Sequence, residues 1–353
     1  MATSRLSAAP ATRKATLRSC TLDELREWVE LRGFEPYRAN QIAGWLYNRP
    51  LTALADMHNL PAPLREALDQ DFDCSIPNVA KESRSADGTV KLLVGLTDDK
   101  VVESVLIPRE DHLTLCISSQ VGCALACSFC ATATLGLQRN LDPSEIVAQV
   151  LLARAAAEPE ILTNYVFMGM GEPLANYDNL IRAIEIMTAR WGLGISPRRI
   201  TVSTVGLVPQ LERLVRDTNV HVAVSLTAAR DELRDRLMPV NRRWPLAELM
   251  NACKRLDLPR RKRVTFEYVL LAGVNDTARD AAELVRLCHG VPVKLNLIPF
   301  NPFPGTQFRR PSDASVEEFQ RRLLAANVTA TVRKSRGRDI EAACGQLAAA
   351  AQA

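Results

Sequence analysis

Between residues 112 and 300 the sequence alternates between short apolar runs, rich in β-branched residues, and longer segments with helical periodicity. Near-continuous apolar runs of this kind are typical of parallel strands, because helices cover both faces of the sheet that they form. Six runs have this character, at residues 112–118, 161–169, 198–204, 220–226, 263–271 and 291–300. The alternation therefore predicts an α/β fold, a partial (βα)6 barrel of about 200 residues spanning residues 111–310.

The segment before the repeat has a different pattern. Residues 1–18 are basic and rich in small residues, and we expect a disordered lead there. Residues 19–76 hold three segments with helical periodicity, the first with Thr21 as its N-cap, and predict a small helical accessory domain. Core packing is the favoured interpretation of its aromatic residues, and an RNA-docking surface is the alternative; these residues are Trp28, Trp45 and Tyr47.

Two further segments flank the barrel. Residues 77–110 alternate with the period of strands around an Asp87-Gly88 turn, which predicts a β-hairpin linker. Residues 311–353 form a C-terminal segment in which we expect a strand and then a helix.

The composition is that of a folded protein. Apolar residues make up 47% of the 353, enough for a sizeable core. No apolar run reaches the roughly 18 residues of a membrane helix, and the N-terminus lacks the apolar region of a secretory signal. Nine cysteines without an export signal indicate a reducing compartment. We therefore expect a cytoplasmic protein without membrane contact, and a monomer by default.

Positive charge is clustered in the second half of the chain, although the net charge is only +4. The clusters are Arg242–Arg243, Arg260–Arg263, Arg309–Arg310 and Arg333–Arg338. Such clusters suit contact with phosphate, whereas solvated helix ends and loops would explain any one of them equally well. Together they favour a nucleic-acid partner.

Three of the nine cysteines, Cys123, Cys127 and Cys130, follow a C-x3-C-x2-C pattern. This uneven triplet suits an iron–sulfur cluster better than tetrahedral zinc, which usually draws on separated pairs or on histidines. Three thiolates leave one iron of a four-iron cluster without a protein ligand, where a substrate can coordinate and accept an electron. The alternative is three unconnected thiols.

Other polar residues follow the predicted parallel strands. The carboxyl ends of parallel strands meet at one edge of a sheet. These residues should therefore lie together with the cysteine loop at one open end of the barrel, its mouth. They are Gly171, Glu172, Ser203, Ser225, Leu226, Thr227 and Asn301, with the apolar Leu226 included as part of the Ser225–Thr227 run.

Two residues are ambiguous from the sequence alone. Glu103 lies within VVESVLIP, where strand alternation favours a side chain that faces water. Cys344 lies within AACGQL, where a lone cysteine among alanines is more often a small buried residue than a nucleophile.

The motifs in combination resemble a known family. CISSQVGCALACSFCATATLGLQRNL is followed by VFMGMGEPLANYDN, ITVSTVG, MPVNRRWPL, NLIPFNPFPG and RGRDIEAACGQL, covering nearly all of the chain after residue 18. The cysteine loop is similar to that of the radical S-adenosylmethionine (SAM) superfamily. Within that superfamily, the motifs SSQVGC and AACGQL together resemble those of the RlmN family of 23S rRNA and tRNA adenine-C2 methyltransferases.

The resemblance implies a role for each matching residue. Cys123, Cys127 and Cys130 would hold a [4Fe–4S] cluster whose fourth iron binds SAM. The residues at the predicted mouth would contact SAM. Cys344 would be the cysteine that is methylated, Cys116 its partner cysteine, and Glu103 the proton acceptor.

The resemblance also implies a reaction. One SAM would methylate Cys344, and a second would generate a radical that activates this methyl group for addition to carbon 2 of adenine. Glu103 would remove the proton from carbon 2, and Cys116 would then release the product by forming a disulfide with Cys344. The substrates would be 23S rRNA and tRNA, and an external electron donor would reduce the cluster and the disulfide.

One residue departs from the family pattern, and two rival functions stay open. The family has Ser-Leu-His-Ala where this chain has Ser225-Leu226-Thr227-Ala228, so a side-chain contact from Thr227 to SAM is in doubt. The rivals are a C8-adenine rRNA methyltransferase of the resistance type and a non-catalytic iron–sulfur protein that binds RNA or acts as a sensor.

Overall fold

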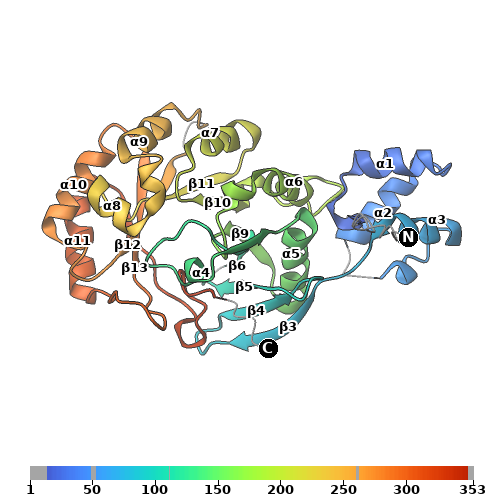
Figure 1. Cartoon of the computed structure of the whole chain (residues 1–353), viewed down its shortest axis with the longest axis horizontal. Coiled ribbons are helices and arrows are strands. Elements are labelled where there is room, and N and C mark those ends of the chain that lie inside the picture. Colours follow the sequence, from blue (N-terminus) through green and yellow to red (C-terminus); the bar gives the residue numbers. More distant parts are fainter. Residues whose placement is uncertain (1–13, 49–52, 111, 260–261, 349–353) are drawn as a thin grey trace, which may run out of the picture.

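The computed structural model describes residues 14–48, 53–110, 112–259 and 262–348. Within these residues ten strands form one curved sheet in the order β14-β13-β12-β11-β10-β9-β6-β5-β4-β3 (Figure 1). Their bounds are β3 Asn78–Arg84, β4 Val90–Gly95, β5 Val101–Pro108, β6 Leu113–Cys116, β9 Leu162–Phe167, β10 Ile200–Thr204, β11 His221–Ser225, β12 Val264–Leu270, β13 Val293–Pro299 and β14 Ala330–Val332.

The sheet has a parallel part and an antiparallel part. Strands β6, β9, β10, β11, β12, β13 and β14 pair in parallel. Strands β3, β4 and β5 pair antiparallel, and β5 joins β6. The predicted fold class is confirmed, with β14 as an additional parallel strand. The predicted hairpin turns at Asp87-Gly88, and its two strands are continuous with the barrel sheet.

Helices connect the parallel strands and lie in an arc along the sheet (Figure 1). Their bounds are α4 Ala131–Thr134, α5 Pro143–Ala157, α6 Tyr177–Thr188, α7 Val208–Asp217, α8 Asp231–Leu237, α9 Leu246–Arg255, α10 Ala278–Cys288 and α11 Asp313–Ala325. Helix α5 starts with a capping box, in which Asp142 accepts from the Glu145 N–H and Glu145 accepts from the Asp142 N–H. None of the helices described is both long and apolar enough to cross a membrane.

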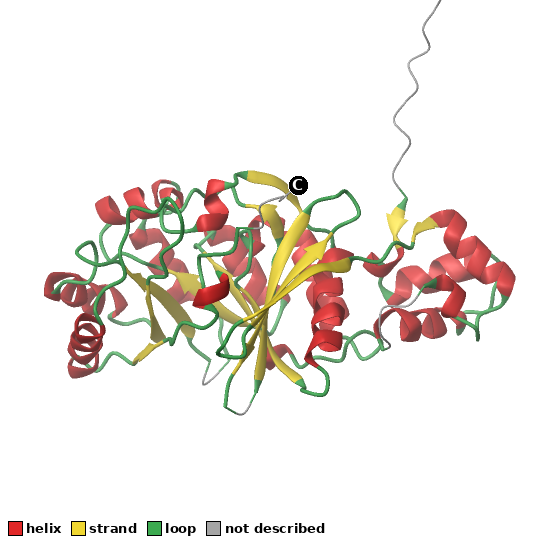
Figure 2. Cartoon of the chain, turned by 90° about the horizontal axis from the view of Figure 1, so that it is seen from below, coloured by secondary structure: helices red, strands yellow, loops and turns green. Residues whose placement is uncertain are grey.

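The N-terminal helices α1 Leu22–Leu31, α2 Arg38–Tyr47 and α3 Ala62–Asp71 form a separate body at one end of the molecule (Figure 2). It contacts the barrel through an ion pair from Arg182 to Glu24 at 2.5 Å and a hydrogen bond from the Ser144 N–H to Ser19 Oγ. The predicted core packing of its aromatic residues is confirmed, because they pack in or against the hydrophobic core; they are Trp28, Trp45 and Tyr47.

The expectation of disorder for residues 1–18 is wrong for residues 14–18. Strand β1 Ala15–Thr16 pairs in parallel with β2 Phe72–Asp73, and Leu17 and Arg18 are buried. A two-residue strand has no periodicity, so only its distant partner makes this order visible. Residues 1–13 lie outside the described part of the chain.

The prediction of a helix after β14 is also wrong for the described residues, which end at residue 348. A 3-10 turn at Arg338–Ile340 is followed by irregular backbone, and residues 349–353 lie outside the described part. Gly337, Glu341 and Gly345 have left-handed φ angles of 65°, 53° and 84°, which an α-helix does not admit. The alanine-rich sequence favours a helix locally, but long-range contacts of this segment override that preference.

Candidate functional site

The three cysteines of the C-x3-C-x2-C pattern lie in a loop between the short strands β7 Gln120–Gly122 and β8 Leu137–Asn140. These strands pair antiparallel, and the Cys123 N–H donates to the Gly136 carbonyl, which closes the base of the loop. Within the loop the Cys130 N–H donates to the Cys127 carbonyl. One cavity of about 160 Å³ at the mouth of the barrel is lined by all three cysteines, Cys123, Cys127 and Cys130.

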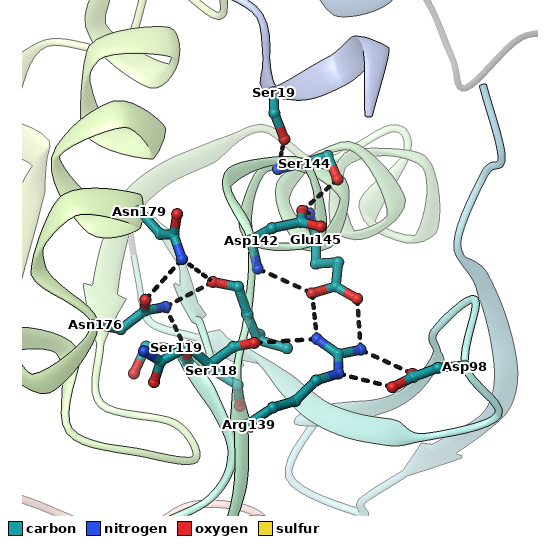
Figure 3. A network of polar contacts seen from close by, with 12 residues as sticks. Ser19, Asp98, Ser118, Ser119, Arg139, Asp142, Ser144, Glu145, Asn176 and Asn179 are labelled. Atoms are coloured by element: carbon teal, nitrogen blue, oxygen red, sulfur yellow. Dashed lines mark hydrogen bonds and ion pairs between the residues drawn. The ribbon is translucent and has the colours of Figure 1, made fainter. Parts of the chain in front are cut away.

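Polar contacts fix the base of this loop to the surrounding elements (Figure 3). The Arg139 guanidinium donates two hydrogen bonds to Asp98 and two to Glu145, which joins β8 to the β4–β5 turn and to α5. Asn176 donates to the carbonyls of Ser119 and Leu141 on either side of the loop. The loop is thus held on a rigid base, as a bound cluster requires.

Burial of the three thiols disfavours their ionised form, which is the form that binds a metal. Burial first, and neighbouring negative groups second, raise the pKa of Cys123 to about 11 and also raise that of Cys127. In the described residues no three His, Cys, Asp or Glu side chains converge on one ion position. Each thiolate of a four-iron cluster binds a different iron, so a cluster does not require such convergence. The residues present fit a [4Fe–4S] cluster, whose positive irons would stabilise the three thiolates.

Five of the predicted SAM-contacting residues line the same cavity as the cluster cysteines; they are Gly171, Glu172, Ser203, Ser225 and Asn301. At Gly171, which has a φ of 97°, an added Cβ would lie 2.5 Å from the Gln120 Cβ, so this close approach requires glycine.

The Glu172 carboxylate is fixed inside this cavity. It accepts hydrogen bonds from the N–H groups of Leu174 and Val205, at 3.1 and 2.9 Å. Burial outweighs these bonds and raises the pKa of Glu172 to about 7. Each carboxylate oxygen has a second lone pair, so the group can still accept a hydrogen bond from a ligand amino group.

Leu226 and Thr227 do not line this cavity. The Leu226 carbonyl accepts from Arg234 Nε, and the Thr227 carbonyl accepts from Asn275 Nδ2. Thr227 has a left-handed φ of 56°, and its buried Oγ1 has no hydrogen-bond partner among the described residues. A contact from either residue to SAM stays a prediction.

Cys344 and Cys116 lie together, although they are far apart in the sequence. Cys344 lines the large cavity, and it also lines a smaller adjoining cavity together with Cys116. Both thiols are free. Burial, and then the charge of Cys344, raise the pKa of Cys116 to about 12. The two cysteines thus border the same small cavity, next to the cavity that the three loop cysteines line.

Backbone contacts hold Cys344 in this position. Asn301 Nδ2 donates to the Cys344 carbonyl at 3.2 Å, and the Ala131 N–H, next to Cys130, donates to the Gly345 carbonyl at 2.8 Å. The β3–β4 hairpin holds the same segment from the other side through Ser85 Oγ to Asp339 Oδ1 at 2.6 Å and the Gly337 N–H to Asp87 Oδ2 at 2.9 Å.

The interpretation of Glu103 as a water-facing residue is wrong. Its side chain is 7% exposed, and its carboxylate forms an ion pair with Lys91 at 2.9 Å. The Ser118 hydroxyl donates to the Glu103 carbonyl, which places this part of β5 beside the end of β6, where the cluster loop begins. Glu103 lines neither of the two cavities.

Two functional candidates were not recognised in the sequence. Glu267, on β12, lines the large cavity and accepts two hydrogen bonds from Asn296 Nδ2. The sequence feature that could have identified Glu267 is a carboxylate inside the apolar run RVTFEYVLL. Arg333 was expected to contact phosphate, but it lines both cavities. Its pKa is raised, and the interaction with Cys344 is the largest cause.

Comparisons with known proteins agree with this site. The family model of the radical SAM superfamily matches residues 117–285, and that of the ribosomal RNA large subunit methyltransferase N-terminal domain matches residues 16–73. The dual-specificity RNA methyltransferase RlmN of Geobacter sulfurreducens is 53% identical over 94% of this chain and 91% of its own length. The RlmN of Syntrophobacter fumaroxidans is 50% identical over 93% and 96%.

A solved structure supports the same relationship. The radical SAM methyltransferase from Sphaerobacter thermophilus superposes with a TM-score of 0.90 at 46% identity, over 94% of this chain and 99% of that one. Membership of the radical SAM superfamily implies a [4Fe–4S] cluster and SAM as cofactors. The chain belongs to the RlmN family of radical SAM RNA methyltransferases.

Proposed function

We propose that the protein methylates carbon 2 of adenine in both 23S rRNA and tRNA, using Cys344 as the carrier of the methyl group. One observation carries the proposal: Cys344 shares one cavity with Cys123, Cys127 and Cys130, and a second cavity with Cys116. The relatives are described as dual-specificity RNA methyltransferases, which supports RNA of two kinds as substrate.

The cluster and SAM, when bound, supply the methyl group and the one-electron chemistry that activates it. Cys123, Cys127 and Cys130 hold the cluster. Gly171 lets this strand end pack closely against Gln120, and the Glu172 carboxylate beside it would accept a hydrogen bond from the SAM amino group. Ser203, Ser225 and Asn301 supply further polar contacts, so that SAM is oriented towards Cys344.

Carbon 2 of adenine carries no usable lone pair, so it cannot attack a methyl donor directly. The Cys344 sulfur instead carries the carbon into a covalent bond with carbon 2, and Glu103 accepts the proton that carbon 2 loses. The Cys116 thiol then loses its proton and attacks the Cys344 sulfur. A disulfide forms, the bond from Cys344 to the transferred carbon breaks, and its electron pair passes to the adenine–carbon unit, which takes up a proton to complete the methyl group. An external donor must return two electrons to the disulfide before the next cycle.

The N-terminal helical domain is the proposed RNA-docking accessory of a monomeric enzyme. It matches the N-terminal domain of a ribosomal RNA methyltransferase family over residues 16–73 and lies outside the radical SAM core. This match favours the C2 enzyme over the C8 rival of the resistance type. The non-catalytic rival would have no use for Cys344.

The test is an anaerobic assay of the cluster-loaded protein with SAM, a reductant and transcripts of 23S rRNA and tRNA. We expect 2-methyladenosine in the digested RNA of both kinds, and a methyl group on Cys344 in the peptide mass spectrum. Product from a Cys344→Ala variant would contradict the covalent route. 8-Methyladenosine without 2-methyladenosine would assign the chain to the C8 reaction instead.

A further inference from the structure

The side chain of Lys91, on β4, contacts two parts of the site at once. Its ammonium forms an ion pair with Glu103 Oε1 at 2.9 Å, and it donates to the carbonyl of Glu341 at 3.3 Å. Glu341 lies on the loop that carries Cys344. We infer that Lys91 is a positioning residue that holds the proton acceptor, Glu103, against the loop of the methyl-carrying cysteine. This inference rests on the proposed function.

The register of the sheet explains why Lys91 reaches Glu103. Lys91 pairs with Val105, and Leu93 pairs with Glu103, so Lys91 and Glu103 are diagonal neighbours on one face of the antiparallel pair. On the same face of β5, Val105 pairs with Cys116. One face of the neighbouring strands β4, β5 and β6 therefore carries Lys91, Glu103 and Cys116.

The two oxygens of the Glu103 carboxylate differ. Oε1 is paired with Lys91, whereas Oε2 is buried and has no hydrogen-bond partner among the described residues. A buried polar atom without a partner is costly and calls for a functional explanation. The side chains of Lys91 and Glu103 are 16% and 7% exposed, so the ion pair lies in a poorly solvated place. Oε2 is then the carboxylate oxygen that Lys91 leaves unpaired.

The contact with Glu341 sets the distance between the acceptor and the cysteine. Lys91 is not what attaches the loop, because Ser85, Asp87, Asn301 and Ala131 hold the same segment independently. Removal of Lys91 should therefore leave Cys344 at the cluster cavity but misplace the acceptor. The loss should fall on proton removal and not on the methylation of Cys344.

The experiment uses the cluster-loaded enzyme with Lys91→Met and Lys91→Arg. Lys81→Met, on the exposed face of β3, is the matched control. Three quantities are measured anaerobically: methylated Cys344 by peptide mass, covalent protein–RNA adduct on denaturing gels, and 2-methyladenosine. For Lys91→Met we expect Cys344 methylation within about twofold of wild type, accumulation of the adduct, and product formation lowered about 100-fold, the scale of general-base catalysis. Lys91→Arg should recover most of the product rate, and Lys81→Met all of it.

Each outcome decides a specific point. Wild-type turnover of Lys91→Met, or a loss of Cys344 methylation in proportion to product, would overturn the inference. A wild-type enzyme that forms neither methylated Cys344 nor 2-methyladenosine would instead overturn the proposed function. If Lys91→Met folds poorly, the Lys91→Met/Glu103→Gln double variant removes both charges of the pair. It should match Glu103→Gln alone, because the two residues act as one unit, and independent losses that multiply would contradict the pairing.

Discussion

The parallel and antiparallel parts of the sheet contribute different chemistry to the same site. The parallel strands end in the residues proposed for SAM, such as Glu172, Ser203 and Asn301, next to the cluster loop. The antiparallel strands β4 and β5 carry Lys91 and Glu103, and the β3–β4 turn holds the segment that leads to Cys344. The family model of the superfamily matches only residues 117–285, from the parallel part. The proposed proton acceptor therefore has a structural support separate from that of the cofactor site, whereas the Cys344 segment is held by both parts, and mutations should separate proton removal from cofactor chemistry.

The largest effect is expected from removal of a cluster ligand. Cys127→Ala should lose the iron–sulfur absorbance and form neither methylated Cys344 nor product, a loss of more than about 1000-fold, because both halves of the reaction depend on this cavity. Absorbance spectra, iron content and peptide mass measure this. Cys288→Ala, a buried cysteine on α10, is the control and should keep the cluster. A Cys127→Ala protein with full iron content would refute the ligand assignment.

Glu103→Gln should break the reaction at a later point. The variant keeps the cluster and the cavity, so Cys344 should still be methylated, while product formation falls by about 100-fold to 10,000-fold and the covalent adduct accumulates. Gel electrophoresis of the protein with labelled RNA measures the adduct. Equal losses in both half-reactions would mean that the two parts of the sheet are not separable.

The pH dependence of SAM binding tests the parallel part alone. Since burial raises the pKa of Glu172 to about 7, the carboxyl is mostly protonated below this pH, and SAM binding must then release the proton. Affinity should be lost as the pH falls through 7, by about tenfold between pH 7.5 and 6. Calorimetry of the cluster-loaded protein measures it. Glu172→Gln should bind SAM more weakly at both pH values but with a flat profile, and an unchanged slope in this variant would assign the proton elsewhere.

The smallest effect is expected at the basic cluster of residues 260–263. Residues 260 and 261 lie outside the described part, but Lys262 and Arg263 directly precede β12, at the edge of the sheet opposite to the mouth. Lys262 Nζ is already engaged by the Asn219 carbonyl and side chain. Lys262→Glu/Arg263→Glu should change RNA affinity by less than about twofold, as titrations at two salt concentrations would reveal. A large drop and a flatter salt dependence would restore the RNA-contact interpretation.

Local patterns predicted the parts of the molecule that depend on local chemistry. The βα alternation, the N-cap at Thr21 and the turn at Asp87-Gly88 each follow from residues a few positions apart, and all are present. The cysteine triplet is equally local, and its three members do share a cavity. In these cases the sequence spacing is the physical determinant.

The remaining features depend on distant partners. Glu103 has the alternation of a water-facing residue, and only the packing of β5 between β4 and β6 buries it next to Lys91. The region around Cys344 has helical propensity, yet hydrogen bonds to Asn301 and Ala131 and three left-handed residues give it an irregular path. Arg333 belongs to a basic run but points into the barrel. Family resemblance, and not spacing, assigned roles to Glu103 and Cys344 at the sequence level.

The anchoring of Cys344 also has a consequence for how the enzyme matures. The residues around 342–347 are synthesised long after the cysteine loop, and their docking sites include Ala131 and Thr132, directly beside Cys130. The part of the cavity wall that Cys344 and Gly345 supply is therefore the last part of the site to be synthesised.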